Sequence, residues 1–157
     1  MDVNAILKDV RSGTMDIKEA EELLKKLPYE DLGYAKIDHH RNIRQGFEEV
    51  IYCQGKETQH LVGICRRMAE EGLNVLGTRA SKAVLRQVPE FIYEPVSRLL
   101  KLECRKTELI GKVVVCTGGT ADIPVAEEAA GVAEFFGTAV TRLFDVGVAG
   151  IHRLLGN

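Results

Sequence analysis

One segment, residues 112–144, constrains the fold most strongly, because its pattern is that of a strand, a glycine loop, a helix and a second strand. An apolar run from Val113 to Cys116 leads into "GGTADIPVAEEAA" at residues 118–130. A helical stretch ended by Gly137 and an extended stretch at 139–144 follow. This order predicts a βαβ unit with two parallel strands. Because both faces of a parallel strand are usually covered, we expect the apolar run to be buried.

The helix between these two strands has apolar side chains at helical spacing, which predicts one buried stripe. The members of this stripe are Val125, Ala129, Val132, Ala133 and Phe136.

The N-terminal segment has the pattern of a helical hairpin. Apolar residues recur at helical spacing over 3–10 and again over 17–27. Asp16 and Glu19 have the spacing of a capping box for the second helix, and Pro28 is expected to end it.

Helical and extended patterns also alternate through the middle of the chain. Strands are predicted at 49–53, 74–78, 91–93 and 99–102, a helix at 61–72, and a short helix capped by Ser81. We therefore predict an α/β fold with three parts. They are an N-terminal helical hairpin (1–30), a small α/β domain (31–108) and the first βαβ of a parallel-sheet, Rossmann-like three-layer domain (109–157).

Composition limits the partners of this chain. Its 157 residues include 21 basic and 23 acidic side chains, a net charge of −2, so no overall field attracts nucleic acid or an anionic membrane. No apolar run reaches the length of a membrane span and no leader is recognised, so a soluble cytoplasmic protein is expected. The cysteines never form a CxxC pair and are predicted to be reduced core thiols. They are Cys53, Cys65, Cys104 and Cys116.

The glycine loop has the features of an anion site. Gly118 and Gly119 follow the first strand of the βαβ unit, at the edge where parallel sheets bind ligands. Paired glycines allow close backbone approach, and the following helix N-terminus favours a phosphate. Asp122 can be the N-cap of this helix. The alternative is that the glycines only turn and Asp122 only caps, since neither a GxGxxG nor a GxxxxGK[ST] motif is present.

Two further polar stretches are candidates. His152 and Arg153 follow the second strand, where an imidazole can transfer protons and a guanidinium can bind an anion; the alternative is a surface pair that starts a helix. Lys36, Asp38 and Arg41 can contact a polar ligand or lie on a solvated loop. Adjacent His39 and His40 would point to opposite faces of an extended chain, which disfavours a shared metal, so no metal ligands are assigned.

Three stretches together resemble the LarB family, which makes an intermediate of the nickel-pincer nucleotide cofactor. They are "LGYAKIDHHRNIRQGFEEVIYCQGK", "NVLGTRAS", and "GGTADIPVAEEAA" followed by "DVGVAGIHRLL". The resemblance covers nearly the whole chain. The C-terminal part of the family is similar to PurE, the aminoimidazole ribotide carboxylase and mutase. The phosphate loop of PurE matches Gly118 to Asp122, and its Ala-His-Arg stretch matches Gly150 to Arg153.

The resemblance implies a carboxylase that also cleaves a phosphoanhydride. The family's substrate is nicotinic acid adenine dinucleotide, and its co-substrate is CO2 or bicarbonate. Its products are pyridinium-3,5-biscarboxylic acid mononucleotide and AMP. A cysteine thiolate adds to the pyridinium ring and activates the opposite carbon, which is covalent catalysis. Mg²⁺ or a similar divalent metal assists the hydrolysis.

Site roles are carried over only to matching positions. By resemblance, Gly118, Gly119 and Thr120 surround a phosphate, Asp122 contacts ribose or polarises the site, and His152 with Arg153 lie near the reacting ring. The weaker candidates, from the N-terminal part, are Lys36, Asp38, Arg41 and Arg79.

Two departures from the family pattern bear on activity. Ala121 stands where the family's loop usually has serine. None of the four cysteines falls at the family's nucleophile motif, and the family continues beyond a segment like this one. The chain alone is therefore expected not to turn over substrate.

Three classes of function stay open. The first is the synthase just described, with a homo-oligomer expected because PurE-like domains form octamers. The second is a PurE-like carboxylase or mutase acting on an imidazole ribotide. The third is a non-catalytic nucleotide-binding or assembly module.

Overall fold

The structure, a computed structural model, describes residues 3–25, 29–39, 41 and 45–156. Its contacts divide the chain into two compact units, Met1–Glu49 and Val50–Asn157. Within the described ranges, no helix combines the length and the apolar character needed to cross a bilayer.

The first unit contains the predicted helical hairpin, α1 (Val3–Ser12) and α2 (Ile17–Lys25). Ile6 and Ala20 are buried between these helices, as the apolar spacing predicts. Asp16 Oδ1 accepts the Glu19 N–H at 2.8 Å, which is one half of the predicted capping box. Pro28 lies outside the described residues. After the hairpin, β1 (Glu30–Asp31) pairs antiparallel with β2 (Lys36–Ile37).

The second unit begins with a mixed sheet in the order β3-β4-β6-β5. Its strands are β3 (Val50–Tyr52), β4 (Val75–Thr78), β5 (Ile92–Glu94) and β6 (Leu99–Leu102). β3 and β4 are parallel and are connected by α4 (Thr58–Glu70), whereas β4–β6 and β6–β5 are antiparallel. These four strands and α4 overlap the ranges predicted for them. Ser81 caps the 3₁₀ helix Lys82–Arg86 by accepting the Ala83 N–H.

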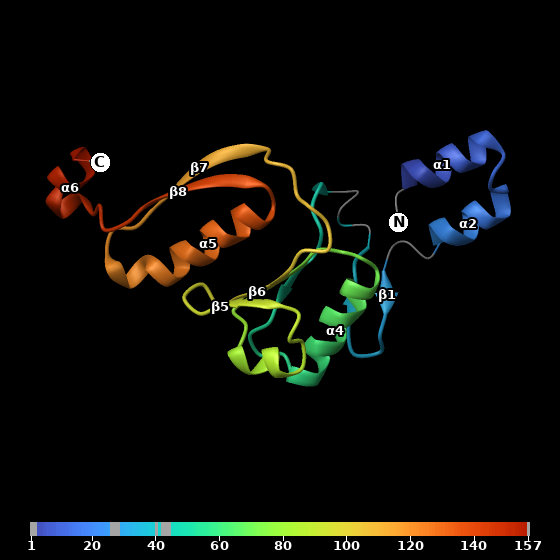
Figure 1. The fold of residues 1–157 in the computed structure, drawn as a ribbon, viewed down its shortest axis with the longest axis horizontal. Coiled ribbons are helices and arrows are strands. Elements are labelled where there is room, and N and C mark those ends of the chain that lie inside the picture. Colours follow the sequence, from blue (N-terminus) through green and yellow to red (C-terminus); the bar gives the residue numbers. More distant parts are fainter. Residues whose placement is uncertain (1–2, 26–28, 40, 42–44, 157) are drawn as a thin grey trace. The chain divides into compact units, whose positions relative to one another are not determined.

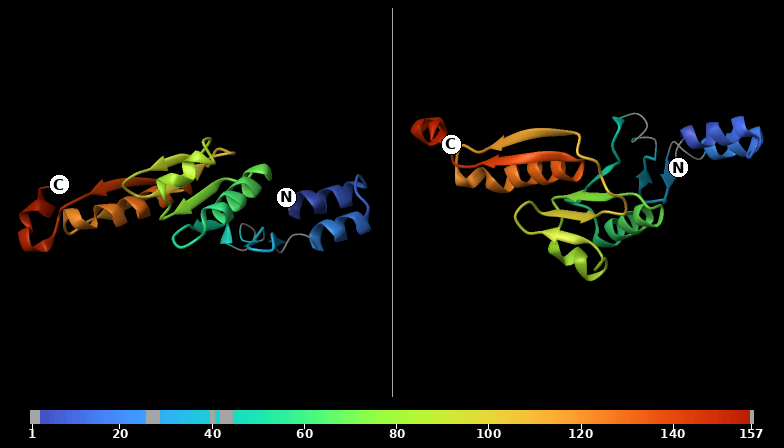
Figure 2. Two further views of the ribbon diagram at one scale, coloured as in Figure 1. Left: turned by 90° about the horizontal axis from the view of Figure 1, so that it is seen from below. Right: turned by 45° about the horizontal axis from the view of Figure 1, so that its top comes forward.

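The predicted βαβ unit completes the second unit. β7 (Gly111–Cys116), α5 (Ile123–Phe135) and β8 (Thr138–Leu143) follow one another, and β7 pairs parallel with β8 from Gly111↔Thr138 to Cys116↔Leu143. In Figure 1, α5 lies between the β7–β8 pair and the β5–β6 hairpin, and both views of Figure 2 show it running along the strand pair. The α/β fold class is confirmed.

The expected burial of β7 is wrong. Val113 is 42% exposed and Val114 is 60% exposed, and Cys116 is exposed as well. Val113 and Val114 point to opposite faces of β7, so both faces are partly accessible: the strand belongs to a two-stranded sheet that α5 covers only in part. An apolar run is therefore typical of a strand that can be buried. Whether the strand is buried depends on the elements that pack against it.

The predicted stripe on α5 is partly wrong. Val125 is 67% exposed and Ala129 is also exposed, whereas Val132 and Phe136 pack against the core as expected. The residues that α5 buries are Ala126, Ala130, Gly131 and Phe135. The helix contacts both the four-stranded sheet and the β7–β8 pair, so it has two packing faces instead of one stripe.

Gly131 allows the four-stranded sheet to approach α5 closely. A Cβ atom at this position would lie 2.5 Å from Leu99 Cδ1 and 3.3 Å from Glu94 Oε2. Leu99 belongs to the core cluster that also contains Leu76 and Phe135. The βαβ unit is thereby packed directly onto the preceding sheet.

Candidate functional site

The glycine loop joins the carboxyl end of β7 to α5. A short 3₁₀ turn, Thr120–Asp122, connects Gly119 to the first residue of the helix, Ile123. Asp122 occupies the predicted N-cap position, but its side chain makes no capping bond to α5. Its Oδ2 instead accepts the Gly119 N–H at 3.1 Å. The carboxylate therefore closes the loop on itself and fixes the orientation of the Gly119 peptide.

The ends of β7 and β8 meet through Thr117, a residue that the sequence pattern does not single out. Thr117 is 4% exposed, and its Oγ1 accepts the Asp145 N–H at 2.9 Å. Its carbonyl accepts the Val146 N–H at 2.9 Å. The available sequence signal is a hydroxyl residue immediately after a buried-type strand. These bonds hold the segment after β8 against the glycine loop.

Gly147 makes this approach close. A Cβ atom there would lie 2.4 Å from the carbonyl oxygen of Gly118, a backbone atom that cannot move aside by rotating a side chain. At Gly119, by contrast, an added Cβ would meet nothing within 4 Å. The parallel pairing predicted for the βαβ unit is confirmed, its two strand ends lie together, and Gly147 is the position that allows this.

Arg153 reaches these strand ends from α6 (His152–Leu155). Its Nη1 forms an ion pair with Asp145 Oδ1 at 2.8 Å. Its Nη2 lies 3.5 Å from the point that a Cβ atom would occupy if Gly147 carried a side chain. Asp145 has a left-handed backbone with φ +59°, an uncommon conformation for a residue with a side chain. His152 begins the same short helix and is exposed. The structure therefore brings Arg153 to the segment after β8 that contacts the glycine loop, with His152 next to it in the chain.

The N-terminal candidates lie in the first unit. Lys36 Nζ is 3.7 Å from Asp31 Oδ2 and 4.8 Å from the centroid of the Tyr29 ring. The Asp38 N–H donates to Glu49 Oε2 at 2.8 Å. Arg41 contacts two partners in this unit: its N–H donates to the Asp38 carbonyl at 3.4 Å and its Nε to Gln45 Oε1 at 3.1 Å. His39 Nε2 lies 3.4 Å from Glu30 Oε2, and His40 lies outside the described residues.

Arg79 follows β4 and contacts the βαβ unit. Its Nε is 3.6 Å from Glu128 Oε1 on α5, and its guanidinium carbon lies 5.6 Å from the centroid of the Tyr52 ring. Arg79 thus links the carboxyl ends of β3 and β4 to the helix that carries the glycine loop.

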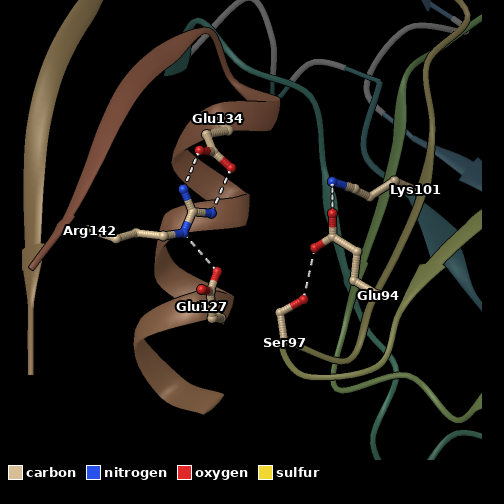
Figure 3. A network of polar contacts seen from close by, with 6 residues as sticks. All are labelled: Glu94, Ser97, Lys101, Glu127, Glu134 and Arg142. Carbon is tan, nitrogen blue, oxygen red and sulfur yellow. Dashed lines mark hydrogen bonds and ion pairs between the residues drawn. The ribbon is translucent and has the colours of Figure 1, made fainter. Parts of the chain in front are cut away.

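A charged network fastens α5 to its neighbours. Arg142 on β8 donates to Glu134 at 2.6 and 2.9 Å and to Glu127 at 2.9 Å. Figure 3 shows these bonds facing a second group, in which Glu94 pairs with Lys101 and accepts from Ser97.

The pKa of Glu134 is lowered, first because Arg142 donates hydrogen bonds to its carboxylate. The same bonds raise the pKa of Arg142. Both groups are therefore ionised at neutral pH, and their interaction holds α5 on β8.

The four cysteines fall into two groups. Cys53 and Cys65, the buried thiols, are core thiols as predicted, and burial raises their pKa to about 11 and about 12. Cys104 and Cys116, the exposed thiols, contradict the prediction of core positions. A thiol with so high a pKa carries almost no thiolate at neutral pH, so neither buried thiol is suited to nucleophilic chemistry.

Comparisons with known proteins agree with the sequence motifs. Residues 29–105 match the family model described as the LarB/PurE-like N-terminal domain. The chain is also similar to "Uncharacterized protein MJ0165" of Methanocaldococcus jannaschii, with 32% identity over 161 residues. That alignment covers 95% of this chain and 63% of the relative, so the chain spans less than two thirds of the relative's length. The resemblance to the LarB family is thus confirmed, with residues 29–105 similar to the LarB/PurE-like N-terminal domain.

Proposed function

We propose that this chain binds nicotinic acid adenine dinucleotide for the LarB reaction in nickel-pincer cofactor biosynthesis. In that reaction the pyridinium ring is carboxylated with CO2 or bicarbonate, and the phosphoanhydride is hydrolysed to release AMP. The single observation that carries the proposal is the contact between the glycine loop and the segment from Asp145 to Arg153, at the carboxyl ends of β7 and β8. This is the edge of a parallel strand pair at which ligands bind. A cytoplasmic homo-oligomer is part of the same proposal.

The residues of this edge suit a phosphate next to a ring. The backbone of Gly118 to Thr120 approaches a phosphate, and the N-terminus of α5 contributes a partial positive charge. Arg153 lies beside Gly147, where its guanidinium can bind an anionic oxygen of the ligand in place of the Asp145 carboxylate. Asp122, already bound to Gly119, keeps the loop in shape and can accept a ribose hydroxyl. His152 is exposed on α6, where its imidazole can accept or donate a hydrogen bond.

The chain by itself is proposed to bind without turnover. No cysteine matches the nucleophile motif of the family, and the two buried thiols have pKa values too high for that role. Across the described residues, no group of three or more His, Cys, Asp or Glu side chains could hold a metal ion. The divalent metal that the resemblance implies is therefore not given protein ligands, and no step of the proposal depends on it.

Equilibrium binding tests the proposal directly. The chain is titrated calorimetrically with nicotinic acid adenine dinucleotide and, separately, with aminoimidazole ribotide, the ligand of the PurE-like alternative. We expect the dinucleotide to bind more tightly. Preference for the ribotide would favour the alternative, and no binding of either would leave a non-catalytic assembly module.

Activity is measured in parallel with labelled bicarbonate and magnesium. The chain is expected to incorporate no label into the nucleotide, whereas the longer Methanocaldococcus jannaschii relative is expected to incorporate it and to release AMP. Absence of both products with the relative would refute the proposed reaction. Label incorporated by the chain alone would refute the proposal that it binds without turnover.

A further inference from the structure

A second group of side chains lies at the carboxyl ends of β3 and β4. Tyr52 is the last residue of β3 and is 51% exposed. Its hydroxyl donates to Gln54 Oε1 at 3.2 Å, and Arg79 Nη1 donates to the same oxygen at 3.5 Å. The guanidinium carbon of Arg79 is 5.6 Å from the centroid of the Tyr52 ring, within the range of a cation–π contact. We call these three residues the Tyr52 platform.

The platform is held by a strained but well-supported turn. Arg79 has φ +52°, and Arg98, itself at φ +55°, donates from Nη2 to the Arg79 carbonyl at 3.2 Å. Arg98 Nε also donates to the Ala80 carbonyl at 3.3 Å, and the Ala80 N–H returns a bond to the Arg98 carbonyl at 2.8 Å. Such conformations persist only where neighbouring groups enforce them, and they concentrate at ligand sites.

Charge balance decides which ligand the platform suits. Glu128 Oε1 lies 3.6 Å from Arg79 Nε, so the positive charge is offset before any ligand arrives. A phosphate or carboxylate would be repelled by this glutamate. A neutral planar ring would not be repelled by the glutamate, and it can stack on a tyrosine ring or on a guanidinium plane.

Gln54 points to a purine. Its Oε1 accepts from both Tyr52 and Arg79, which leaves its amide NH2, a donor, for the edge of a ligand. Adenine presents ring nitrogens that accept hydrogen bonds, and a glutamine amide is a usual partner for its edge.

The distance to the glycine loop fits one nucleotide. Glu128, the platform's contact on α5, is five residues beyond Ile123, where the helix begins, which corresponds to about 8 Å along the helix axis. A phosphate at the glycine loop therefore leaves a base within reach of Arg79.

We propose that the Tyr52 platform, formed by Tyr52, Gln54 and Arg79, binds the adenine ring of the substrate by stacking and by a hydrogen bond from Gln54. The inference rests on the proposed function. It assigns the adenine end of the dinucleotide to the carboxyl ends of β3 and β4, and the phosphates to the end of β7.

The test is calorimetric titration of the chain with AMP and with nicotinic acid mononucleotide, which has the ribose phosphate but no adenine. Tyr52→Ala is expected to weaken AMP binding about tenfold, the usual scale for loss of one stacked base. Its affinity for the mononucleotide should be unchanged. Tyr52→Phe keeps the ring and should keep AMP affinity, and Tyr34→Ala removes an exposed tyrosine of the first unit as the matched control.

Several results would overturn the inference: no AMP binding to the wild-type chain, equal AMP affinity in Tyr52→Ala, or an equal loss for both ligands. Should Tyr52→Ala fail to fold, as judged by circular dichroism, Gln54→Ala on an exposed side chain replaces it, with a several-fold loss of AMP affinity expected. If the dinucleotide still binds while these variants bind AMP normally, the platform assignment is wrong and the proposed function stands. If AMP binds at the platform but the dinucleotide does not bind, the proposed function fails and so does the substrate assignment that rests on it.

Discussion

Replacing Gly147 by alanine should separate the two strand ends of the candidate site. The backbone at this position has φ −58°, which alanine adopts without strain, so the effect is purely steric. The added Cβ would lie 2.4 Å from the Gly118 carbonyl oxygen, about 1 Å closer than ordinary contact. Since both groups belong to backbone, the segment after β8 must move away from the glycine loop.

The expected cost of this movement is about 1–3 kcal/mol of unfolding free energy, the usual range for overpacking. For a chain of this length that corresponds to a melting temperature lower by roughly 3–9 °C. Binding of nicotinic acid adenine dinucleotide should weaken in parallel, because Arg153 and the glycine loop no longer share one edge. Calorimetric melting and titration measure the two effects.

Gly119→Ala is the matched control for stability. Its φ of −156° is extended backbone, and an added Cβ meets nothing within 4 Å. This variant should melt within about 2 °C of the wild type, in line with the small effect of most surface substitutions. Equal stability and equal ligand affinity in Gly147→Ala and the wild type would refute the close approach of the two strand ends.

Three further predictions follow from the site and its supports. At neutral pH a maleimide should label the two exposed thiols quickly and the two buried thiols only after denaturation, as followed by mass spectrometry; rapid labelling of all four would contradict the burial described above. Arg142→Ala should lower stability by about 1 kcal/mol or less, because the ion pairs are partly exposed. The lowered pKa of Glu134 makes this contribution fully present above its ordinary pKa of 4.5 and progressively lost as the pH falls below it, so urea unfolding should show a larger difference from wild type at pH 7 than at pH 3. Asp122→Asn keeps an oxygen that can accept the Gly119 N–H, so stability should change by less than about 1 kcal/mol. In a full-length relative carrying this change at the matching position, turnover should fall while folding stays intact. Unchanged turnover would show that Asp122 only closes the loop and takes no part in the reaction.

Local patterns were sufficient for most elements of the fold. The helical hairpin, the strands β3 to β8 and the order of the βαβ unit follow from the period of apolar residues and from the glycine, proline and capping residues that bound each segment. These signals act between residues near one another in the chain, so a single sequence carries them. The meeting of the two strand ends also followed, since the strands of a βαβ unit are parallel.

The details of the site depended on contacts between distant segments. Thr117 and Gly147 are 30 positions apart in the sequence. Only the folded chain shows that Thr117 accepts a hydrogen bond from the segment after β8 and that Gly147 lies against Gly118. The bond from Gly119 to Asp122 is local, but it competes with the capping bond that the spacing predicts, and the loop conformation decides between them.

The sequence by itself determined which segments become helices and strands, and it carried the motifs that resemble the LarB family. Only the tertiary structure decided which of their faces are covered. The same apolar pattern predicted burial for Val114 and Cys116 on β7 and for Val125 on α5, yet all three are exposed. Periodicity describes how side chains are distributed around one element, whereas burial depends on the neighbours that pack against it, and those neighbours are set by the whole fold.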